Sequence, residues 1–348
     1  MRALSDFDIP TLRQQFEGWG HKPAQADKLL REFYRKAGRL DFELLKLGRA
    51  LERRIKHEIA LRQSRVLKKT ESADGTVKLL VAFTGGGAVE TTLMHTPRKE
   101  RAAGCVSSQM GCAMGCDFCA STRQGLARNL TAGEIVEQFL HLRELAAQSR
   151  RRLHTLVFMG MGEPLLNLEN VIAAIRRIGG PELGGLGWRQ ITVSTVGIVP
   201  GMDALARAGL NVALAVSLHA PDDRTRSRIV PVNQRYGVAE VVAAARRFYK
   251  LTGRITNLEY CLLRGVNDSD EQAQQLAALL KGFRTHVNLI PYNRIGAGLS
   301  GTVYEPPPPE RVREFLKILR AAKVVAHLRQ ARGADVRAAC GQLREMVG

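Results

Sequence analysis

The sequence predicts an α/β protein in which a partial or full (β/α) barrel follows a small N-terminal domain of helices and a β-ribbon. Three observations support this fold class. The chain has 348 residues, which is enough for about two domains. The apolar pattern changes from helical to alternating within the first 95 residues. From residue 104 onward, strand-like and helical segments alternate, as in a parallel sheet covered by helices.

Residues 1–95 are expected to form a module with helices before strands. Apolar residues recur at helical spacing at Leu29, Leu30, Phe33, Leu44, Leu45, Leu47, Leu51 and Ile55. From Arg65, the segments RVLKKTE, TVKLLVAF and AVETTLM alternate like strands, and ADG and TGGG between them favour tight turns. We therefore predict amphipathic helices followed by a three-stranded antiparallel ribbon.

Residues 96–348 contain the repeated strand–helix pattern. Strand-like segments begin near residues 104, 153, 189, 211, 255, 286 and 324, and helices near Thr131, Leu168, Val238, Ser269 and Glu310. An open doubly wound sheet is the alternative, although the GxGxxG fingerprint of a dinucleotide-binding fold is missing. In both architectures the site is expected at the carboxyl ends of the strands. The unusual sequences SSQMGCAMGCDFC, MGMGEP, STVG, SLHAP and PYN all lie there.

The charge of the chain favours a polyanionic partner. Lys and Arg number 52 against 33 Asp and Glu, a formal net charge of +19, which is typical of nucleic-acid binding. An Arg-rich composition could produce the same total without RNA. The uneven distribution favours RNA, because residues 31–69 hold 13 basic and five acidic side chains. Trp19, Phe33 and Tyr34 are candidates for stacking on bases, with core packing as the alternative.

Other features exclude several protein classes. The chain has no run of about 20 apolar residues that would cross a membrane. Its first ten residues lack the apolar segment of a secretory signal, so we expect a cytoplasmic protein. Six cysteines in 348 residues are too few for a disulfide scaffold.

Three of these cysteines have the spacing of a metal centre. Cys112, Cys116 and Cys119 form a C-x3-C-x2-C pattern in a Gly-containing loop after the first barrel strand. Structural zinc normally has a fourth Cys or His at a paired spacing, and none follows nearby. A [4Fe–4S] cluster with three cysteine ligands leaves one iron open for a small molecule. The pattern therefore favours an iron–sulfur cluster over zinc.

The same loop carries a resemblance to a known family. CAMGCDFC, with Phe118 before the last cysteine, resembles the signature of the radical S-adenosylmethionine (SAM) superfamily, and MGMGEP resembles its GGEP motif. From about residue 90 to the C-terminus, the chain resembles the RlmN/Cfr-type RNA methyltransferases. The blocks that carry this resemblance are, in order, CVSSQMGCAMGCDFC, FMGMGEPLLN, ITVSTVGIVP, VSLHAPDD, GVNDS, VNLIPYN and AACGQL. The implied fold is the radical SAM type of (β/α) barrel.

The resemblance also implies roles for individual residues. One [4Fe–4S] cluster would be held by Cys112, Cys116 and Cys119, with SAM on the open iron. The implied SAM contacts are Gly162, Glu163, Ser194, Ser217, Leu218, His219 and Asn293. Cys340 matches the methyl-carrying cysteine, and Cys105 matches the resolving thiol that forms a transient disulfide with it. Glu90 is the implied proton acceptor, whereas Cys261 matches no family position and is expected in the core.

The implied activity is methylation of C2 of an adenosine in the peptidyl-transferase centre of 23S rRNA and of the adenosine 3′ to the anticodon in tRNA. This carbon is electron-poor and does not attack SAM directly. The family therefore uses two SAM molecules per turnover, one to methylate Cys340 and one as the radical source. An electron donor such as flavodoxin is implied, and we expect a monomer.

Two alternatives remain at this point. The first is Cfr-type methylation of C8, which gives antibiotic resistance; Pro164 after the Gly-Glu pair favours C2. The second, from another class, is a non-catalytic, zinc-containing RNA-binding protein. The tail also departs from the family pattern, because Ala334 and Arg337 stand where acidic residues are common. We therefore expect the tail to dock less securely.

Overall fold

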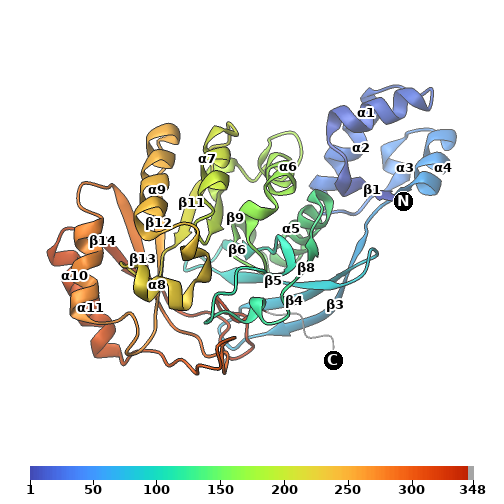
Figure 1. The fold of residues 1–348 in the computed structure, drawn as a ribbon. Helices are drawn as coiled ribbons and strands as arrows, with labels where there is room; N and C mark the ends of the chain where they lie inside the picture. Colours follow the sequence, from blue (N-terminus) through green and yellow to red (C-terminus); the bar gives the residue numbers. More distant parts are fainter. Residues whose placement is uncertain (344–348) are drawn as a thin grey trace.

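A ten-stranded sheet organises the molecule, whose computed structural model describes residues 1–343. The strand order is β14-β13-β12-β11-β10-β9-β6-β5-β4-β3 (Figure 1). The strands from β6 to β14 pair in parallel, and those from β3 to β6 pair antiparallel. The sheet thus has two edges, at β14 and β3, so it is a partial barrel and the predicted fold class is confirmed. The strands are β3 (Ser64–Glu71), β4 (Val77–Phe83), β5 (Ala88–His95), β6 (Arg101–Cys105), β9 (Arg152–Phe158), β10 (Ile191–Thr195), β11 (Ala213–Ser217), β12 (Thr256–Leu262), β13 (Thr285–Pro291) and β14 (Val325–Leu328).

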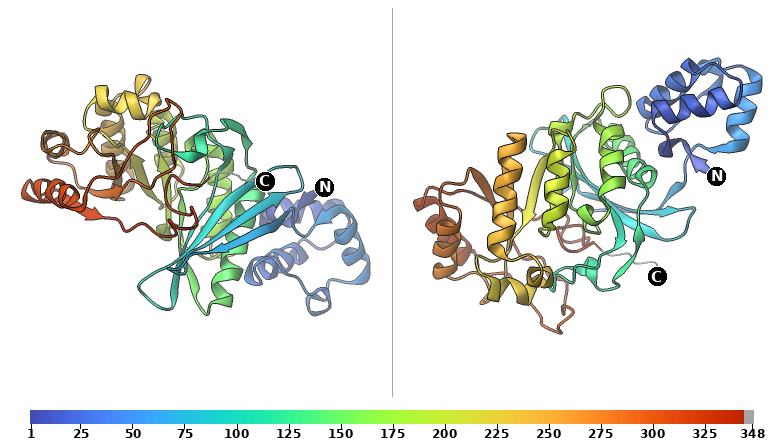
Figure 2. Two further views of the ribbon diagram at one scale, coloured as in Figure 1. Left: turned by 90° about the horizontal axis from the view of Figure 1, so that it is seen from below. Right: turned by 45° about the horizontal axis from the view of Figure 1, so that its top comes forward.

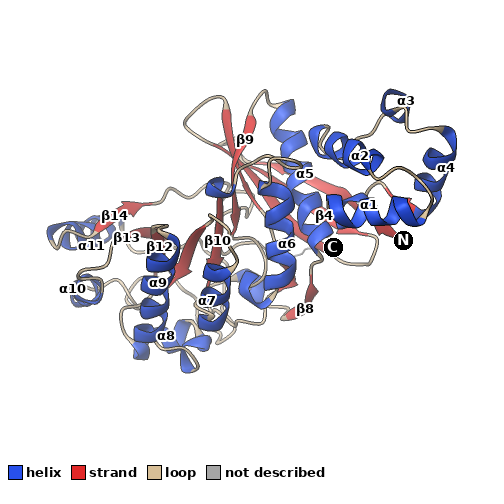
Figure 3. Ribbon diagram, turned by 90° about the horizontal axis from the view of Figure 1, so that it is seen from above, coloured by secondary structure: helices blue, strands red, loops and turns tan. Residues whose placement is uncertain are grey.

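Helices follow the parallel strands and cover one face of the sheet. Figure 3 shows α9, α7 and α6 side by side along this face. All five helices that the sequence predicts here are present, and the capping box at the first is confirmed, since Thr131 accepts a hydrogen bond from the Glu134 N–H at 3.1 Å. The prediction missed α7 and α8, which are short. The helices are α5 (Ala132–Gln148), α6 (Leu168–Gly179), α7 (Val199–Arg207), α8 (Asp223–Ile229), α9 (Val238–Thr252), α10 (Asp270–Leu279) and α11 (Pro309–Ala321).

The N-terminal helices form a bundle at one side of the barrel, as the right-hand view of Figure 2 shows. They are α1 (Ile9–Gly18), α2 (Ala24–Arg35), α3 (Phe42–Leu45) and α4 (Arg49–Glu58). A short parallel pair, β1 (Arg2–Ala3) with β2 (Ile59–Ala60), joins the start of this bundle to its end. Phe33 and Tyr34 are fully buried in it, so core packing is the correct interpretation for both. Trp19 stacks on Phe16 and is covered by the Arg54 guanidinium.

The predicted three-stranded ribbon is present, but it is not a separate sheet. Strand β5 pairs with β6, and this pairing joins the ribbon to the parallel strands. Residue 95 is therefore not a break in the sheet, and the assignment of separate tasks to residues 1–95 and 96–348 stays a prediction. A smaller antiparallel pair, β7 (Gln109–Gly111) with β8 (Leu126–Asn129), brackets the cysteine motif. Short 3₁₀ turns lie at Leu4–Asp6, Ala120–Thr122, Pro164–Leu166, Trp188–Gln190 and Pro231–Gln234.

A buried polar network connects the N-terminal bundle to α5. The carboxylate of Glu137 accepts hydrogen bonds from the Ser5 hydroxyl at 2.7 Å and the Gln63 N–H at 2.9 Å, and also from the Ser64 hydroxyl. His141, one turn along α5, contacts Ser64 and Arg62. The bundle is thus held by directional bonds as well as by apolar packing. Among the described residues, no helix is long and apolar enough to cross a membrane.

Candidate active site

The three motif cysteines lie together in a loop that the surrounding chain holds firmly. Cys112 and Cys116 are buried, and Cys119 is half-buried. Burial raises the pKa of the Cys116 thiol, and the charges of Cys119 and Cys112 raise that pKa further, so the three thiols are near one another. Asp117 anchors the loop, because its carboxylate accepts hydrogen bonds from the Tyr304 hydroxyl at 2.6 Å and the Ser300 N–H at 2.8 Å.

These cysteines suit a cluster better than a single ion. Within residues 1–343, no group of three or more His, Cys, Asp or Glu side chains is placed to hold one metal ion. A tetrahedral zinc needs all its ligands within about 2.3 Å of one point. In a cube, each thiolate binds a different iron, so the sulfur atoms are farther apart. Three neighbouring thiols without a fourth protein ligand among the described residues therefore fit a [4Fe–4S] cluster that leaves one iron open.

The Gly-Glu pair of MGMGEP follows β9 and lies against the start of the cysteine loop. Gly162 has φ +100°, and a Cβ on it would lie 2.5 Å from Gln109 Cβ, so only glycine fits. Glu163 is 2 % exposed, and its carboxylate accepts hydrogen bonds from the Val196 N–H at 2.8 Å and the Leu165 N–H at 3.0 Å. Burial raises the pKa of Glu163 to about 7, although these N–H groups lower it. The carboxylate thus lies between the ends of β9 and β10.

The other predicted SAM contacts on strands lie at neighbouring carboxyl ends. Ser194 is the penultimate residue of β10, and Ser217 ends the adjacent β11. Leu218 and His219 follow directly and are buried, and both N–H groups donate to the Glu259 carbonyl of β12. These four residues therefore lie at the carboxyl edge of this part of the sheet, where the site is expected.

His219 has an unusual conformation for a non-glycine residue. Its φ is +61°, in the left-handed region. The Nδ1 atom accepts a hydrogen bond from the Cys261 N–H at 3.0 Å, and the ring contacts Phe118 edge-on with 4.8 Å between centroids. Burial, and then the charge of Arg226, lowers the pKa of His219 to about 3. The imidazole is therefore neutral and connects the end of β11 to the cysteine loop.

The C-terminal tail brings Cys340 to this edge of the sheet. Cys340 is an exposed residue with a free thiol, and burial of the sulfur atom, and then the charge of Glu259, raises the pKa of that thiol. After Cys340, the Gly341 carbonyl accepts a hydrogen bond from the Ala120 N–H at 2.7 Å, and the Leu343 carbonyl accepts one from the Ser121 hydroxyl at 2.6 Å. The tail is thus bonded to the residues that directly follow Cys119.

Before Cys340, the same tail docks on the turn between β3 and β4. The Asp335 carboxylate accepts hydrogen bonds from the Ser72 hydroxyl at 2.6 Å and the Ala73 N–H at 3.2 Å. Asp74 accepts one from the Gly333 N–H at 3.0 Å. Figure 1 shows this red segment returning to the blue ribbon. These bonds use Asp335 and backbone groups and need no acidic residue at 334 or 337, and the expectation that the tail docks less securely than in the family stays a prediction.

Glu90 and Cys105 lie on the paired strands β5 and β6. Cys105 is opposite Thr92, and the Ser107 hydroxyl donates to the Glu90 carbonyl at 2.7 Å. Glu90 forms a buried ion pair with Lys78, at 2.8 Å between Oε1 and Nζ. Burial, and then the charge of Cys340, raises the pKa of Cys105 to about 12. The thiols of Cys105 and Cys340 are therefore close enough for their charges to interact.

Asn293 and Cys261 complete the set of predicted residues. The Asn293 side-chain amide donates to the Cys340 carbonyl at 3.2 Å, so it contacts the tail directly. Cys261 is buried, as expected of a core residue. Its surroundings are not those of an ordinary core cysteine, because burial and then the charges of Cys340 and Cys119 raise its pKa.

The sequence interpretation missed three polar residues at this edge. The Gln109 side chain accepts a hydrogen bond from the Glu163 N–H at 2.8 Å. Gln109 belongs to the segment SSQMGCAMGCDFC, so its position next to the cysteines was a signal that could have identified it. Glu259 is buried in β12, where the Asn288 side-chain amide donates a hydrogen bond to its carboxylate at 2.8 Å. An acidic residue inside the apolar segment LEYCLL could have identified it as a functional candidate from the sequence. Arg226 is fully buried on α8. No pattern distinguishes it, since residues 224 and 228 are also Arg.

Comparisons with known proteins agree with this geometry. Residues 106–277 match the model of the Radical SAM superfamily. The chain is 51% identical to "Probable dual-specificity RNA methyltransferase RlmN 1" of Opitutus terrae, over 99% of this chain and 98% of the relative. It is 40% identical to "Dual-specificity RNA methyltransferase RlmN" of Syntrophobacter fumaroxidans, over 98% and 97%.

A solved structure extends the agreement to the whole fold. The crystal structure of a radical SAM methyltransferase from Sphaerobacter thermophilus superposes with a TM-score of 0.93 at 41% identity and covers 99% of both chains. The family implies a [4Fe–4S] cluster and SAM as cofactors. The chain therefore belongs to the RlmN family of radical SAM methyltransferases.

Proposed function

We propose that this enzyme methylates C2 of an adenosine in 23S rRNA and in tRNA through a methyl group carried on Cys340. The observation that carries the proposal is the docking of the tail. Cys340 is held between the Asn293 amide and the backbone that follows Cys119, and its charge reaches Cys105. A methyl carrier must lie beside both the radical source and the thiol that later releases the product. This arrangement supplies both neighbours.

The cofactors would supply the methyl group and the radical. SAM held at a [4Fe–4S] cluster would supply an electrophilic methyl group and, after one-electron reduction, the radical reactivity that removes hydrogen from an S-methyl group. The ligands that we assign are Cys112, Cys116 and Cys119. Gly162, Glu163, Ser194, Ser217, Leu218, His219 and Asn293 are the assigned SAM contacts.

The first task of the chain is to accept the methyl group. A new bond forms between Cys340 Sγ and the methyl carbon, the sulfonium bond to that carbon breaks, and the thiol proton leaves to solvent. Burial is the main cause of the raised pKa of Cys105 and the charge of Cys340 adds to it, so methylation of Cys340 removes only the smaller of these two causes. The Cys105 thiol then loses its proton more readily when it is needed later.

The second task is to release the methylated base. Glu90 accepts the proton that leaves the adenine carbon, and the Lys78 ammonium at 2.8 Å favours the ionised carboxylate that this role requires. By then the carbon of the S-methyl group has lost one hydrogen and is bonded to adenine C2. Cys105 attacks Cys340 Sγ as a thiolate, the bond between that sulfur and this carbon breaks, and a transient disulfide forms. The carbon keeps the electron pair of the broken bond and takes up a proton to become the methyl group, and the unpaired electron that remains from the radical step returns to the electron donor.

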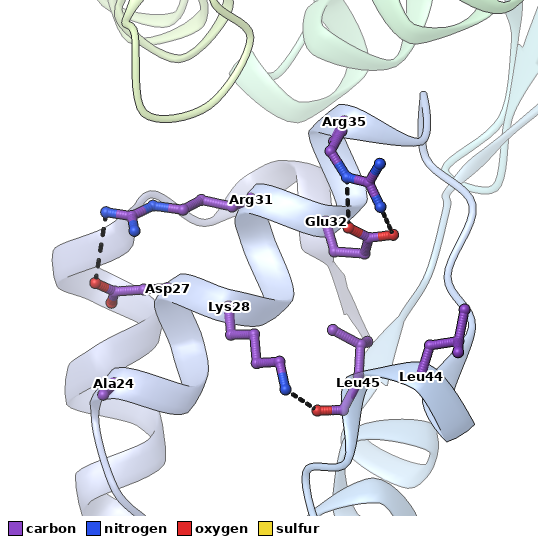
Figure 4. Close-up of a pocket in the computed structure, with 8 residues that line it drawn as sticks. All are labelled: Ala24, Asp27, Lys28, Arg31, Glu32, Arg35, Leu44 and Leu45. Atoms are coloured by element: carbon purple, nitrogen blue, oxygen red, sulfur yellow. Dashed lines mark hydrogen bonds and ion pairs between the residues drawn. The ribbon is translucent and has the colours of Figure 1, made fainter.

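The N-terminal bundle and strand β3 supply a surface for the RNA backbone. Several arginines of this region are already paired, and Figure 4 shows Arg31 with Asp27 and Arg35 with Glu32. These four residues help to line a hollow of about 530 Å³. Six exposed basic residues between positions 31 and 69 form no ion pair within the described chain: Lys36, Lys46, Arg49, Arg53, Arg65 and Lys68. These side chains would contact phosphates, and the target base would leave its stack to reach the barrel.

The test is an anaerobic assay with cluster-loaded enzyme, SAM, a reductant, and fragments of 23S rRNA and tRNA. Mass spectrometry of the digested nucleosides is expected to show 2-methyladenosine. Cys340→Ala should abolish methylation without loss of iron, and Cys105→Ala should accumulate a covalent protein–RNA adduct. Cys261→Ala is the matched control and should retain methylation. Turnover by Cys340→Ala, or free RNA alone with Cys105→Ala, would contradict the proposed cycle.

The two alternatives are less well supported. Relatives over nearly the full length are named RlmN, and Pro164 follows the Gly-Glu pair, so both favour C2 over C8. Detection of 8-methyladenosine would reverse this choice. The non-catalytic zinc protein is wrong, because the chain belongs to a radical SAM family. A flavodoxin-like electron donor, a monomeric state and a cytoplasmic location stay predictions.

A further inference from the structure

Arg226 is a fully buried cation with no carboxylate partner. It is the largest side chain that is less than 2 % exposed, and it forms no ion pair among the described residues. Its Nε donates to the Leu218 carbonyl at 2.9 Å, and its two terminal nitrogens donate to the carbonyls of Val196 (2.5 Å), Ser217 (3.2 Å) and Tyr236 (3.2 Å) and to the Asn233 side chain (2.9 Å). All five acceptors are neutral.

A buried charge of this kind is costly unless an opposite charge is nearby. Burial lowers the pKa of Arg226 to about 10, so the guanidinium still carries its charge at neutral pH. The two acidic groups whose charges interact with it are Cys116 and Asp223. Asp223 is exposed, and its carboxylate already accepts hydrogen bonds from the Asn233 amide and the Val238 N–H. Cys116, the other group, is an assigned cluster ligand.

Helix α8 is attached directly to the loop that holds the cysteines. The Asp117 N–H donates to the Ile229 carbonyl of α8 at 3.0 Å. Cys116 and Phe118 pack in one apolar cluster with Ile229 and Val230. Arg226 therefore faces a site that becomes negative when three thiolates bind a cluster, and more negative when the cluster accepts an electron.

We propose that Arg226 is the buried counter-charge of the [4Fe–4S] cluster, which raises the cluster's reduction potential and also positions the carboxyl ends of β10 and β11 for SAM. A fixed positive charge stabilises the reduced cluster more than the oxidised one, because reduction adds one negative charge. The bonds to Val196, Ser217 and Leu218 hold the segments that carry the proposed SAM contacts. The inference deepens the proposed function and rests on its assignment of the cluster ligands.

The charge and the hydrogen bonds can be separated by substitution. Arg226→Lys keeps the positive charge but cannot reach all five acceptors. Arg226→Met keeps much of the length and removes the charge. Arg224→Gln is the matched control, because it removes one positive charge from an exposed position on the same helix. Each variant is reconstituted anaerobically, its iron is counted, and the midpoint potential of its cluster is measured by spectroelectrochemistry.

We expect Arg226→Met to lower the midpoint potential of the cluster by about 59 mV. At a fixed applied potential, this shift reduces the ratio of reduced to oxidised cluster about tenfold for a one-electron couple. Arg226→Lys should stay close to the wild-type potential but bind SAM more weakly in equilibrium dialysis, and Arg224→Gln should match wild type in both. Equal potentials for Arg226→Met and Arg224→Gln would overturn the inference. If Arg226→Met does not retain iron, Arg226→Gln replaces it: a potential below that of Arg226→Lys supports the counter-charge, and a potential equal to that of Arg226→Lys refutes it.

These outcomes are distinct from failure of the proposed function. Wild-type protein that assembles no iron–sulfur cluster would refute the function itself. Wild-type protein that forms 2-methyladenosine while the Arg226→Met potential is unchanged would refute only the role of Arg226.

Discussion

Replacement of His141 by Gln should make the protein less sensitive to acid. His141 is 8 % exposed on α5, and Arg62 can only donate, so the 3.0 Å contact identifies Nδ1 as an acceptor. The proton is therefore on Nε2, which donates to the Ser64 hydroxyl at 2.9 Å. A second proton on Nδ1 would face the Arg62 guanidinium. Burial, and then the charge of Arg62, lowers the pKa of His141 from 6.5 to about 4.

The sign and size of the effect follow from this shift. The unfolded chain binds a proton at His141 below about pH 6.5, whereas the folded chain does not until about pH 4. The stability that neutral His141 contributes is thus complete above pH 6.5 and is lost as the pH falls toward 4. Each pKa unit is worth about 1.4 kcal/mol, so the loss between pH 7.5 and 5.0 is about 2 kcal/mol.

Urea unfolding followed by circular dichroism at pH 7.5 and pH 5.0 tests this value. Glu137, whose pKa burial raises, and His219 titrate in both proteins, so their effects cancel in the comparison. His141→Gln should reduce the difference in unfolding free energy between the two pH values by about 2 kcal/mol. The exposed His57→Gln is the matched control and should leave that difference unchanged. An identical pH dependence for His141→Gln and wild type would refute the reasoning.

Three further predictions concern the active site. Gly162→Ala should weaken SAM binding in equilibrium dialysis and destabilise the fold by about 1–2 kcal/mol, because the new Cβ strains a φ of +100° and meets Gln109; unchanged binding would contradict the assigned role. Asp335→Ala should slow methylation while iron content stays at the wild-type level, because only the bonds of the tail to Ser72 and Ala73 are lost; Asp203→Ala, on the far helix α7, is its control. Removal of iron by a chelator should speed hydrogen exchange at the Ala120 N–H, which donates to the tail, and equal exchange with and without iron would argue against coupling of tail and cluster.

Much of the fold was predictable because the relevant patterns are local. The seven parallel strands and five of their helices were predicted from apolar periodicity, and Thr131 with Glu134 marked a helix start. The missed helices are short: α8 has seven residues, of which only Arg226 and Ile229 are buried. An apolar pattern cannot reveal a helix whose main buried side chain is an arginine. The pairing of β5 with β6 was also missed. The apolar pattern within a strand predicts that strand but does not show which other strand pairs with it.

By itself, the sequence determined the chemical components of this protein: three cysteines at cluster spacing, the Gly-Glu pair, the family blocks in order, and Cys340 in the tail. Only the tertiary structure decided how these parts meet. The tail bonds to Ser121 and Ser72, which lie 222 and 263 positions earlier in the chain, and Arg226 donates to carbonyls at the ends of two strands. The spacing of residues along the chain identifies the side chains that could bind the cofactors. The burial of a charge and the partner of a distant hydrogen bond exist only after the chain has folded.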